Sequence, residues 1–154
     1  MRDKTEAASA WRRSVEDRLE SRMRQMQMIN AAALHELCSH ALPGSGPDCA
    51  CRAAQTQSWE SITEERWPAA VLKKVGTLRQ ADLDEPTFEE FHPKGTRYDA
   101  PDAPIALSYF PFNRSDVYVC SRCRKAYLRY TEYGGYYVDH RVRMVRADLI
   151  VDGF

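Results

Sequence analysis

The sequence lacks three features that would place it in a broad functional class. It has no excess charge, because 22 Lys and Arg residues balance 22 Asp and Glu residues. Wholesale capture by nucleic acid or by an anionic membrane needs a basic excess. It has no apolar run close to the roughly 20 residues that span a bilayer. Residues 1–22 are charged throughout, without the apolar core of a signal peptide. We therefore expect a cytoplasmic protein with no membrane partner.

Catalytic motifs are also missing. The segment "PGSGP" lacks the Lys-Ser/Thr pair of a phosphate-binding loop, and neither G-x-S-x-G nor H-E-x-x-H occurs. The four histidines are scattered, and His92 lies in "FEEFHPKG", where neighbouring side chains on an extended chain point to alternate faces. The sequence therefore predicts a protein that is not an enzyme.

Residues 5–40 carry a helical pattern. Apolar side chains recur at steps of three, four or about seven, which keeps one stripe in register; they are Trp11, Val15, Leu19, Met23, Met26, Ala33 and Leu37. The pattern predicts one long N-terminal helix that ends near "ALPGSGP", because proline and glycine do not continue it. Packing on its own domain is one interpretation, and dimerisation or partner binding is the other.

The remainder mixes irregular and extended segments. Residues 55–68 are compatible with a short helix, residues 70–80 with a helix end or a strand, and residues 87–93 with a short strand. Residues 93–115 hold four prolines and predict a long irregular segment. In the C-terminal third, apolar and polar side chains alternate along the sequence, which predicts β-strands. We expect a single α+β domain over residues 1–154, with a helical segment 1–40 packed on a small antiparallel sheet in 41–154.

The clearest hairpin surrounds Gly134 and Gly135. Two strand-like runs separated by two glycines predict a two-residue turn that places Tyr133 opposite Tyr136. One face of this hairpin is more apolar and is predicted to meet the core; it carries Tyr127, Tyr133, Tyr136, Val138 and Val142. The other face mixes aromatic and charged residues, which are typical of interfaces. It provides the candidate partner-binding residues Tyr130, Glu132, Tyr137, Asp139 and Arg141. An ordinary solvated sheet face is the alternative.

The cysteines suggest a metal site. Cys120 and Cys123 form C-x-x-C at a corner between strands, and Cys49 and Cys51 form C-x-C in a loop. Structural zinc takes four ligands of this kind, so these four form the predicted ligand set for a structural Zn²⁺ ion. Cys38 or His40 is the alternative to one member of the C-x-C pair. A redox C-x-x-C and unmetallated thiols are the competing interpretations.

The segment around the C-x-x-C also carries a basic character. Tyrosines alternate there with positive side chains, which favours a zinc-ribbon module that binds nucleic acid as the alternative function. The positive residues are Arg122, Arg124, Lys125, Arg129, Arg141, Arg143 and Arg146. Glu132, Asp139, Asp148 and Asp152 lie in the same segment and oppose this interpretation.

Two resemblances follow from these motifs. The flanks "YVCSRCRKAY" resemble the metal knuckle of zinc ribbons and rubredoxin-type sites, although Arg124 stands where such knuckles usually have glycine. The segment from Phe91 to Asp139, and "LRYTEYGGYYVD" within it, resembles a small bacterial family with a C-x-x-C knuckle, loosely similar to toxin-immunity proteins. That resemblance implies a cytoplasmic protein that neutralises one cognate toxin by covering it, and it implies no catalytic residues.

Overall fold

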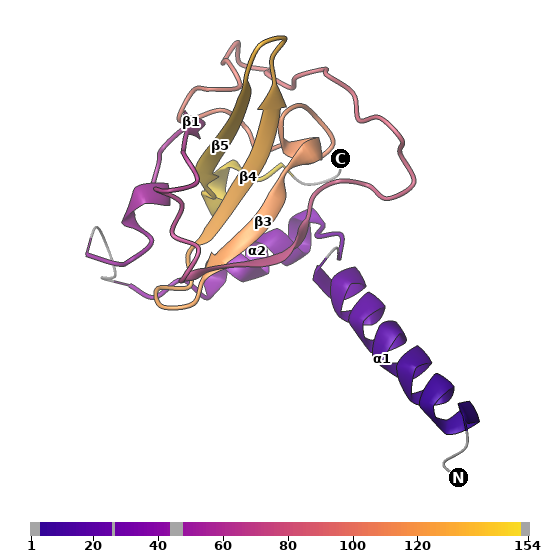
Figure 1. Ribbon diagram of the computed structural model, residues 1–154. Helices are drawn as coiled ribbons and strands as arrows, with labels where there is room; N and C mark the ends of the chain where they lie inside the picture. Colours follow the sequence, from indigo (N-terminus) through magenta and orange to yellow (C-terminus); the bar gives the residue numbers. More distant parts are fainter. Residues whose placement is uncertain (1–3, 26, 44–47, 152–154) are drawn as a thin grey trace.

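The computed structural model describes residues 4–25, 27–43 and 48–151 (Figure 1). It contains two α-helices and one five-stranded sheet in which every pair of neighbours is antiparallel, in the order β1-β5-β4-β3-β2. This confirms the predicted α+β class. The elements are α1 (Lys4–Gln25), α2 (Ala31–Ser39), β1 (Glu60–Ser61), β2 (Leu72–Thr77), β3 (Asp116–Cys120), β4 (Ala126–Tyr133) and β5 (Val138–Met144).

The single helix predicted over residues 5–40 is wrong, because the chain leaves the helical path between α1 and α2. Residues around Met28 run beside β2: the Ile29 amide donates to the Thr77 carbonyl at 2.8 Å, and the Thr77 amide donates to Gln27 at 2.9 Å. Gly76 permits this approach, since a Cβ there would collide with the Gln27 carbonyl and the Ile29 side chain. The chain therefore exchanges helical hydrogen bonds for pairing with the sheet edge.

The two helices have different surroundings. Helix α2 starts with Asn30 as its cap, whose side chain accepts a bond from the Ala33 amide at 2.8 Å. Its Leu34 is fully buried in the core, so α2 packs on the sheet. Helix α1 instead extends away from the rest of the chain (Figure 1), and Trp11 on it is 67% exposed. Helix α2 therefore provides the predicted packing on the sheet, whereas the N-terminal part of α1 extends away from it.

Both faces of the sheet are covered, which gives the protein two cores. The first core contains Leu34, Trp59, Leu128 and Tyr130 and lies on the face covered by α2 and by parts of the irregular segment 93–115. The second core contains Trp67, Tyr127 and Val142 together with three of the cysteines, and these cores are distinct clusters. Adjacent β4 residues alternate between them, as strand geometry requires.

The hairpin prediction is correct in its strands and wrong in its register. Tyr133 pairs with Val138 and not with Tyr136, so the loop has four residues, closed by a bond from the Gly134 amide to the Tyr137 carbonyl at 2.9 Å. The Tyr137 ring lies against Gly134, where a Cβ would collide with it. A slip of two positions leaves each side chain on its predicted face, because the side-chain period is two.

The predicted roles of the two hairpin faces need correction. The face predicted to meet the core does so at Tyr127 and Val142, which are fully buried in the second core. It ends in exposed side chains, with Tyr133 79%, Tyr136 105% and Val138 59% exposed. The face predicted to meet a partner is buried at Tyr130, which is 3% exposed and packs edge-on against Trp59 at 4.8 Å between ring centroids. The irregular segment 93–115 covers this face with Phe110, whose ring centroid lies 6.0 Å from that of Tyr130.

Three local predictions have clear outcomes. Residues 55–68 form no α-helix; they hold β1 and turns, and the Ile62 amide bonds the His140 carbonyl at 2.8 Å at the sheet edge. Residues 87–93 form no strand. The long irregular segment is confirmed over 93–115, apart from a bridge at Ile105 and a 3-10 turn at Phe112–Arg114.

Candidate metal centre

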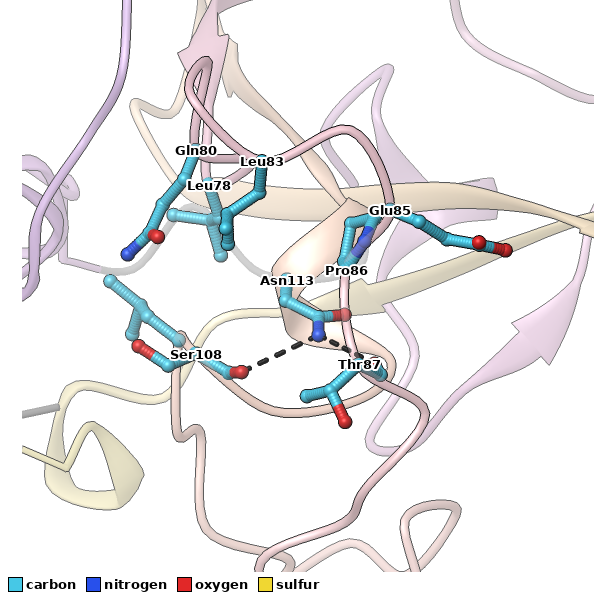
Figure 2. A pocket seen from close by; sticks show the side chains of 9 residues that line it. Leu78, Gln80, Leu83, Glu85, Pro86, Thr87, Ser108 and Asn113 are labelled. Carbon is cyan, nitrogen blue, oxygen red and sulfur yellow. Dashed lines mark hydrogen bonds between the residues drawn. The ribbon is translucent and has the colours of Figure 1, made fainter.

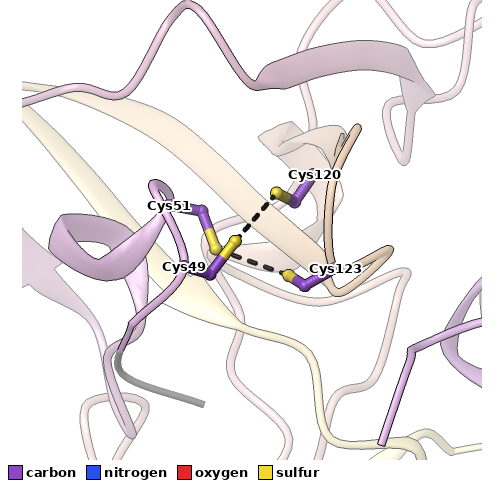
Figure 3. Close-up of side chains that lie close together, drawn as sticks. All are labelled: Cys49, Cys51, Cys120 and Cys123. Carbon is purple, nitrogen blue, oxygen red and sulfur yellow. Dashed lines mark hydrogen bonds between the residues drawn. The ribbon is translucent and has the colours of Figure 1, made fainter. Parts of the chain in front are cut away.

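The predicted four cysteines meet at one point (Figure 3). The Sγ atoms of Cys49 and Cys120 lie 3.7 Å apart, and those of Cys51 and Cys123 lie 3.5 Å apart. All four Sγ atoms are within 4.8 Å of one another, and every cysteine is a free thiol. Four thiolates bound tetrahedrally at a metal–sulfur distance of about 2.3 Å have sulfurs about 3.8 Å apart. The four cysteines can therefore hold a metal ion.

The C-x-x-C half of the site is a tight corner at the end of β3. The Arg124 amide bonds the Cys120 carbonyl at 2.9 Å, and the Cys120 amide bonds the Lys125 carbonyl at 3.0 Å. Arg124 has φ = 65°, the left-handed conformation that usually favours glycine. The chain therefore keeps the backbone turn of a metal knuckle although the usual glycine is replaced by arginine.

The C-x-C half comes from the loop that follows α2. The Arg52 amide bonds the Cys49 carbonyl at 3.0 Å, and the Ala54 amide bonds the Cys51 carbonyl at 2.9 Å, so a short 3-10 turn fixes this loop. A further backbone hydrogen bond links the loop after α2 to the C-x-x-C corner, because the Leu42 amide donates to the Cys123 carbonyl at 2.9 Å. Segments about 70 residues apart in sequence thus converge through backbone bonds as well as through sulfur.

Burial shapes the chemistry of the thiols. Cys51 and Cys120 are fully buried, Cys123 is 1% exposed and Cys49 is half-buried. Burial raises the pKa of Cys123 to about 12 and raises the pKa of Cys51. The backbone amide of Cys51 hydrogen-bonds Cys49 and lowers the pKa of Cys49 to about 7. A bound cation compensates the charge that burial otherwise opposes, since thiols bind metals as thiolates.

Two polar side chains support Cys51. The Tyr127 hydroxyl lies 3.1 Å from its Sγ atom, and the Gln55 Nε2 donates to the same sulfur at 3.4 Å. Burial raises the pKa of Tyr127, so its hydroxyl keeps its proton and can donate to a thiolate. Sequence reasoning missed both residues. A signal was present for Gln55 alone, which is close to Cys51 in sequence, whereas Tyr127 reaches the sulfur only through the fold.

The alternative ligands do not reach the cluster. Cys38 is half-buried and packs against the first core, and burial raises its pKa to about 11. His40 is exposed just after α2. The metal-competent group contains neither of them. The C-x-C pair is therefore the upstream half of the site.

The candidate partner-binding residues do not form one open surface. Arg141 joins the two carboxylates, with Nε 2.8 Å from Glu132 and 3.2 Å from Asp139, and all three are partly buried. With Tyr130 buried, Tyr137, 58% exposed, is the member most open to solvent. The structure thus assigns Glu132, Asp139 and Arg141 to an intramolecular ion cluster beside the hairpin loop.

The predicted basic patch is mostly occupied by internal contacts. Arg129 stacks over Trp67 at 4.3 Å and pairs with Glu64 at 2.6 Å. Arg146 pairs with Asp148 at 2.7 Å, and Arg143 is fully buried. The basic residues that remain most open lie at the knuckle, at Arg122 and Arg124.

Comparisons with known proteins add no family to this description. No family model, no curated protein and no solved structure matches the chain. Among the described residues, neither helix combines the length and apolar character needed to cross a membrane.

Proposed function

We propose that the four cysteines hold one structural zinc ion. The support is the donor set itself: four thiols whose sulfurs all lie within 4.8 Å of one another, three of the cysteines buried, with no carboxylate or histidine among them. Four thiolates fill the preferred coordination of zinc and leave no position for a reactive water, so such a site stabilises a fold and does not catalyse. The ion would link the loop after α2 to the end of β3. We draw no catalytic step from it.

Replacing Tyr127 with phenylalanine tests the support for Cys51. We expect the dissociation constant for zinc to rise about tenfold, the lower end of the effect of removing a hydrogen bond to a metal ligand. Competition with a chromophoric chelator measures it. Tyr118→Phe is the matched control, because Tyr118 is on the same strand pair and packs on Trp67 at 4.9 Å. Equal zinc affinity in the two variants would show that the Tyr127 hydroxyl does not act on the site.

We infer that the protein as a whole is a non-catalytic binding protein, and the hairpin tip is the observation that carries this inference. The hairpin tip consists of Tyr133, Tyr136, Tyr137 and Val138, each at least 58% exposed. Soluble proteins seldom expose neighbouring aromatic side chains without use. Tyrosine gives large contact area at low entropic cost, and aromatic residues are enriched at protein interfaces.

The partner that fits this surface is a protein, and the leading hypothesis is a cognate bacterial toxin. The resemblance of the segment from Phe91 to Asp139 to a small bacterial family that is loosely similar to toxin-immunity proteins motivates that choice. In this hypothesis the protein acts by occlusion, with the hairpin tip seated against the toxin and no reaction run. The ion cluster around Arg141 would hold the two strands together next to the hairpin tip. Nucleic acid is the less favoured partner, since Arg129, Arg143 and Arg146 are engaged within the chain.

Co-expression with the product of the adjacent gene tests this function. We expect a complex of nanomolar affinity and a dissociation constant at least about tenfold higher for Tyr136→Ala, as for a truncated interface residue. Trp11→Ala is the control, because Trp11 is an exposed aromatic residue on α1, away from the hairpin tip. Calorimetry measures both. Absence of a complex with the wild-type chain would contradict the immunity hypothesis, and binding to nucleic acid that weakens steeply with salt would favour the alternative.

A further inference from the structure

A small cavity lies beside the end of β2, away from the cysteines (Figure 2). Its volume is about 240 Å³. Leu78, Leu83 and Leu107 contribute apolar walls, and Pro86 closes one side. Pockets for whole small ligands usually measure about 300–1,000 Å³. The cavity therefore suits one apolar group of the size of an amino-acid side chain.

The polar groups at the cavity do not require a ligand. Asn113 is 6% exposed, and its Nδ2 donates to the Thr87 carbonyl at 2.8 Å and to the Ser108 carbonyl at 3.4 Å. These bonds hold the two irregular segments that form the wall. The Glu85 side chain points away from the other labelled side chains (Figure 2). What the cavity can accept is thus an apolar group.

A charged groove adjoins the cavity. The groove has a volume of about 690 Å³ and shares two lining residues, Gln80 and Leu83, with the cavity. Arg79 and Arg114 line the groove. Lys74 also lines it, but Lys74 is paired with Asp116 at 3.1 Å. The two arginines are therefore the positive groups available next to the apolar cavity, and Asp84 is a further acidic residue in the lining of the groove.

Arg114 is held in place by its surroundings. Its Cζ lies 4.2 Å from the Phe88 ring centroid and 5.1 Å from that of Phe110. Its Nη2 donates to the carbonyls of Pro86 at 3.0 Å and Thr87 at 3.1 Å, and both residues also line the cavity. A guanidinium fixed by stacking and by carbonyls loses little entropy when it binds an anion.

Arg79 approaches the same groove from the end of β2. Its Nη2 donates to the Asp84 carbonyl at 3.2 Å. Within the described part of the chain, no carboxylate forms an ion pair with Arg79 or Arg114. Burial and then the neighbouring Arg79 cation lower the pKa of Arg114, while Glu85 acts in the opposite direction. An anion between the two guanidinium groups would relieve their repulsion.

We propose that the cavity and the groove together bind an organic carboxylate with a short apolar tail. The tail enters the cavity between Leu78, Leu83 and Leu107, and the carboxylate lies in the groove between Arg79 and Arg114. A free branched-chain acid and the carboxyl-terminal leucine of a peptide share this chemistry. None of the cysteines lines the site, but Tyr133 of the hairpin tip lines the groove. Neither arginine belongs to the tip, so binding of a small carboxylate is tested without the proposed protein partner.

Titration of the full-length, zinc-loaded chain with four probes tests the site, with amide resonances or calorimetry as the readout. The probes are 4-methylpentanoate, its neutral amide, acetate, and the peptide acetyl-Gly-Gly-Leu. We expect saturable binding of 4-methylpentanoate or of the peptide, at least tenfold tighter than binding of the amide and of acetate. Preference for one of the two identifies the source of the carboxylate. Saturation by neither, or equal binding of acid and amide, overturns the proposal.

Two variants separate the site from general charge effects. Arg79→Gln removes one guanidinium from an exposed position, and we expect at least tenfold weaker carboxylate binding with an unchanged melting temperature and zinc content. Lys73→Gln removes one positive charge from an exposed position on β2 outside the groove, and we expect no change. Unchanged binding in Arg79→Gln, or equal weakening in both variants, overturns the proposal.

Discussion

If the four cysteines hold the proposed metal ion, replacing Cys51 with serine is expected to abolish its binding and to lower the free energy of unfolding by at least about 3 kcal/mol. Structural zinc contributes folding energy directly, with apparent binding energies of about 10–16 kcal/mol in small zinc domains. Cys51 is fully buried and contacts Cys123, Tyr127 and Gln55, so no water can replace its sulfur without rearrangement. Serine at this position would also leave the buried Tyr127 hydroxyl and the Gln55 amide without the thiolate to which they donate. Elemental analysis and thermal unfolding measure the two effects.

The fifth cysteine provides the control for this variant. Cys38 lies outside the cluster and packs at the edge of the first core. Cys38→Ser should keep one metal ion per chain and lose far less stability than Cys51→Ser. Cys49→Ser and Cys120→Ser should lose the metal as Cys51→Ser does. Full zinc occupancy in any of these three serine variants would remove the replaced cysteine from the ligand set. A wild-type chain that binds no metal would contradict the zinc proposal.

The metal site was predictable because its information is local. C-x-x-C and C-x-C each fix the approach of two sulfurs within a few residues, whereas the alternative donors Cys38 and His40 lie in the helical segment before the C-x-C loop. Joining the two pairs required only that four thiols complete one coordination sphere. The support from Tyr127 was not predictable in the same way. Its position depends on β4 returning beneath the C-x-C loop, which is a property of the whole sheet.

The hairpin faces show where local reasoning fails. The strands of the hairpin were correct, since alternation and turn residues are local signals. Which face is covered depends on where residues 93–115 run, and that irregular segment has no periodicity from which to predict its path. Phe110 and Trp59 enclose Tyr130, so an apparent interface residue became core. The exposed tip, by contrast, projects beyond the segments that cover the sheet.

The break between the two helices has a similar origin. The helical stripe continues from Met26 to Ala33 in sequence, so periodicity alone predicts one helix. Pairing of residues 27–29 with β2 depends on Gly76, about 50 residues later. One local signal was available: Asn30 precedes three alanines and caps α2. Capping residues therefore carried information that the apolar stripe concealed.

Replacing Trp59 with alanine is expected to lower the free energy of unfolding by about 3–5 kcal/mol, the usual cost of truncating a buried tryptophan. Trp59 is 4% exposed, and its ring centroid lies 4.8 Å from that of Tyr130 and 5.7 Å from that of Phe112. Truncation would therefore leave a cavity within the first core. The melting temperature should fall by roughly 6–20 °C for a chain of this size.

The second core gives this prediction a sharper form. Trp59 and the cysteines belong to separate clusters, so we expect Trp59→Ala to bind the proposed zinc ion as the wild-type chain does while its stability falls. Trp11→Ala is the matched control, because Trp11 is 67% exposed on α1 and should change stability by less than about 0.5 kcal/mol. A similar loss of stability in both variants would mean that α1 packs against the domain. Loss of zinc from folded Trp59→Ala would mean that the two cores act as one.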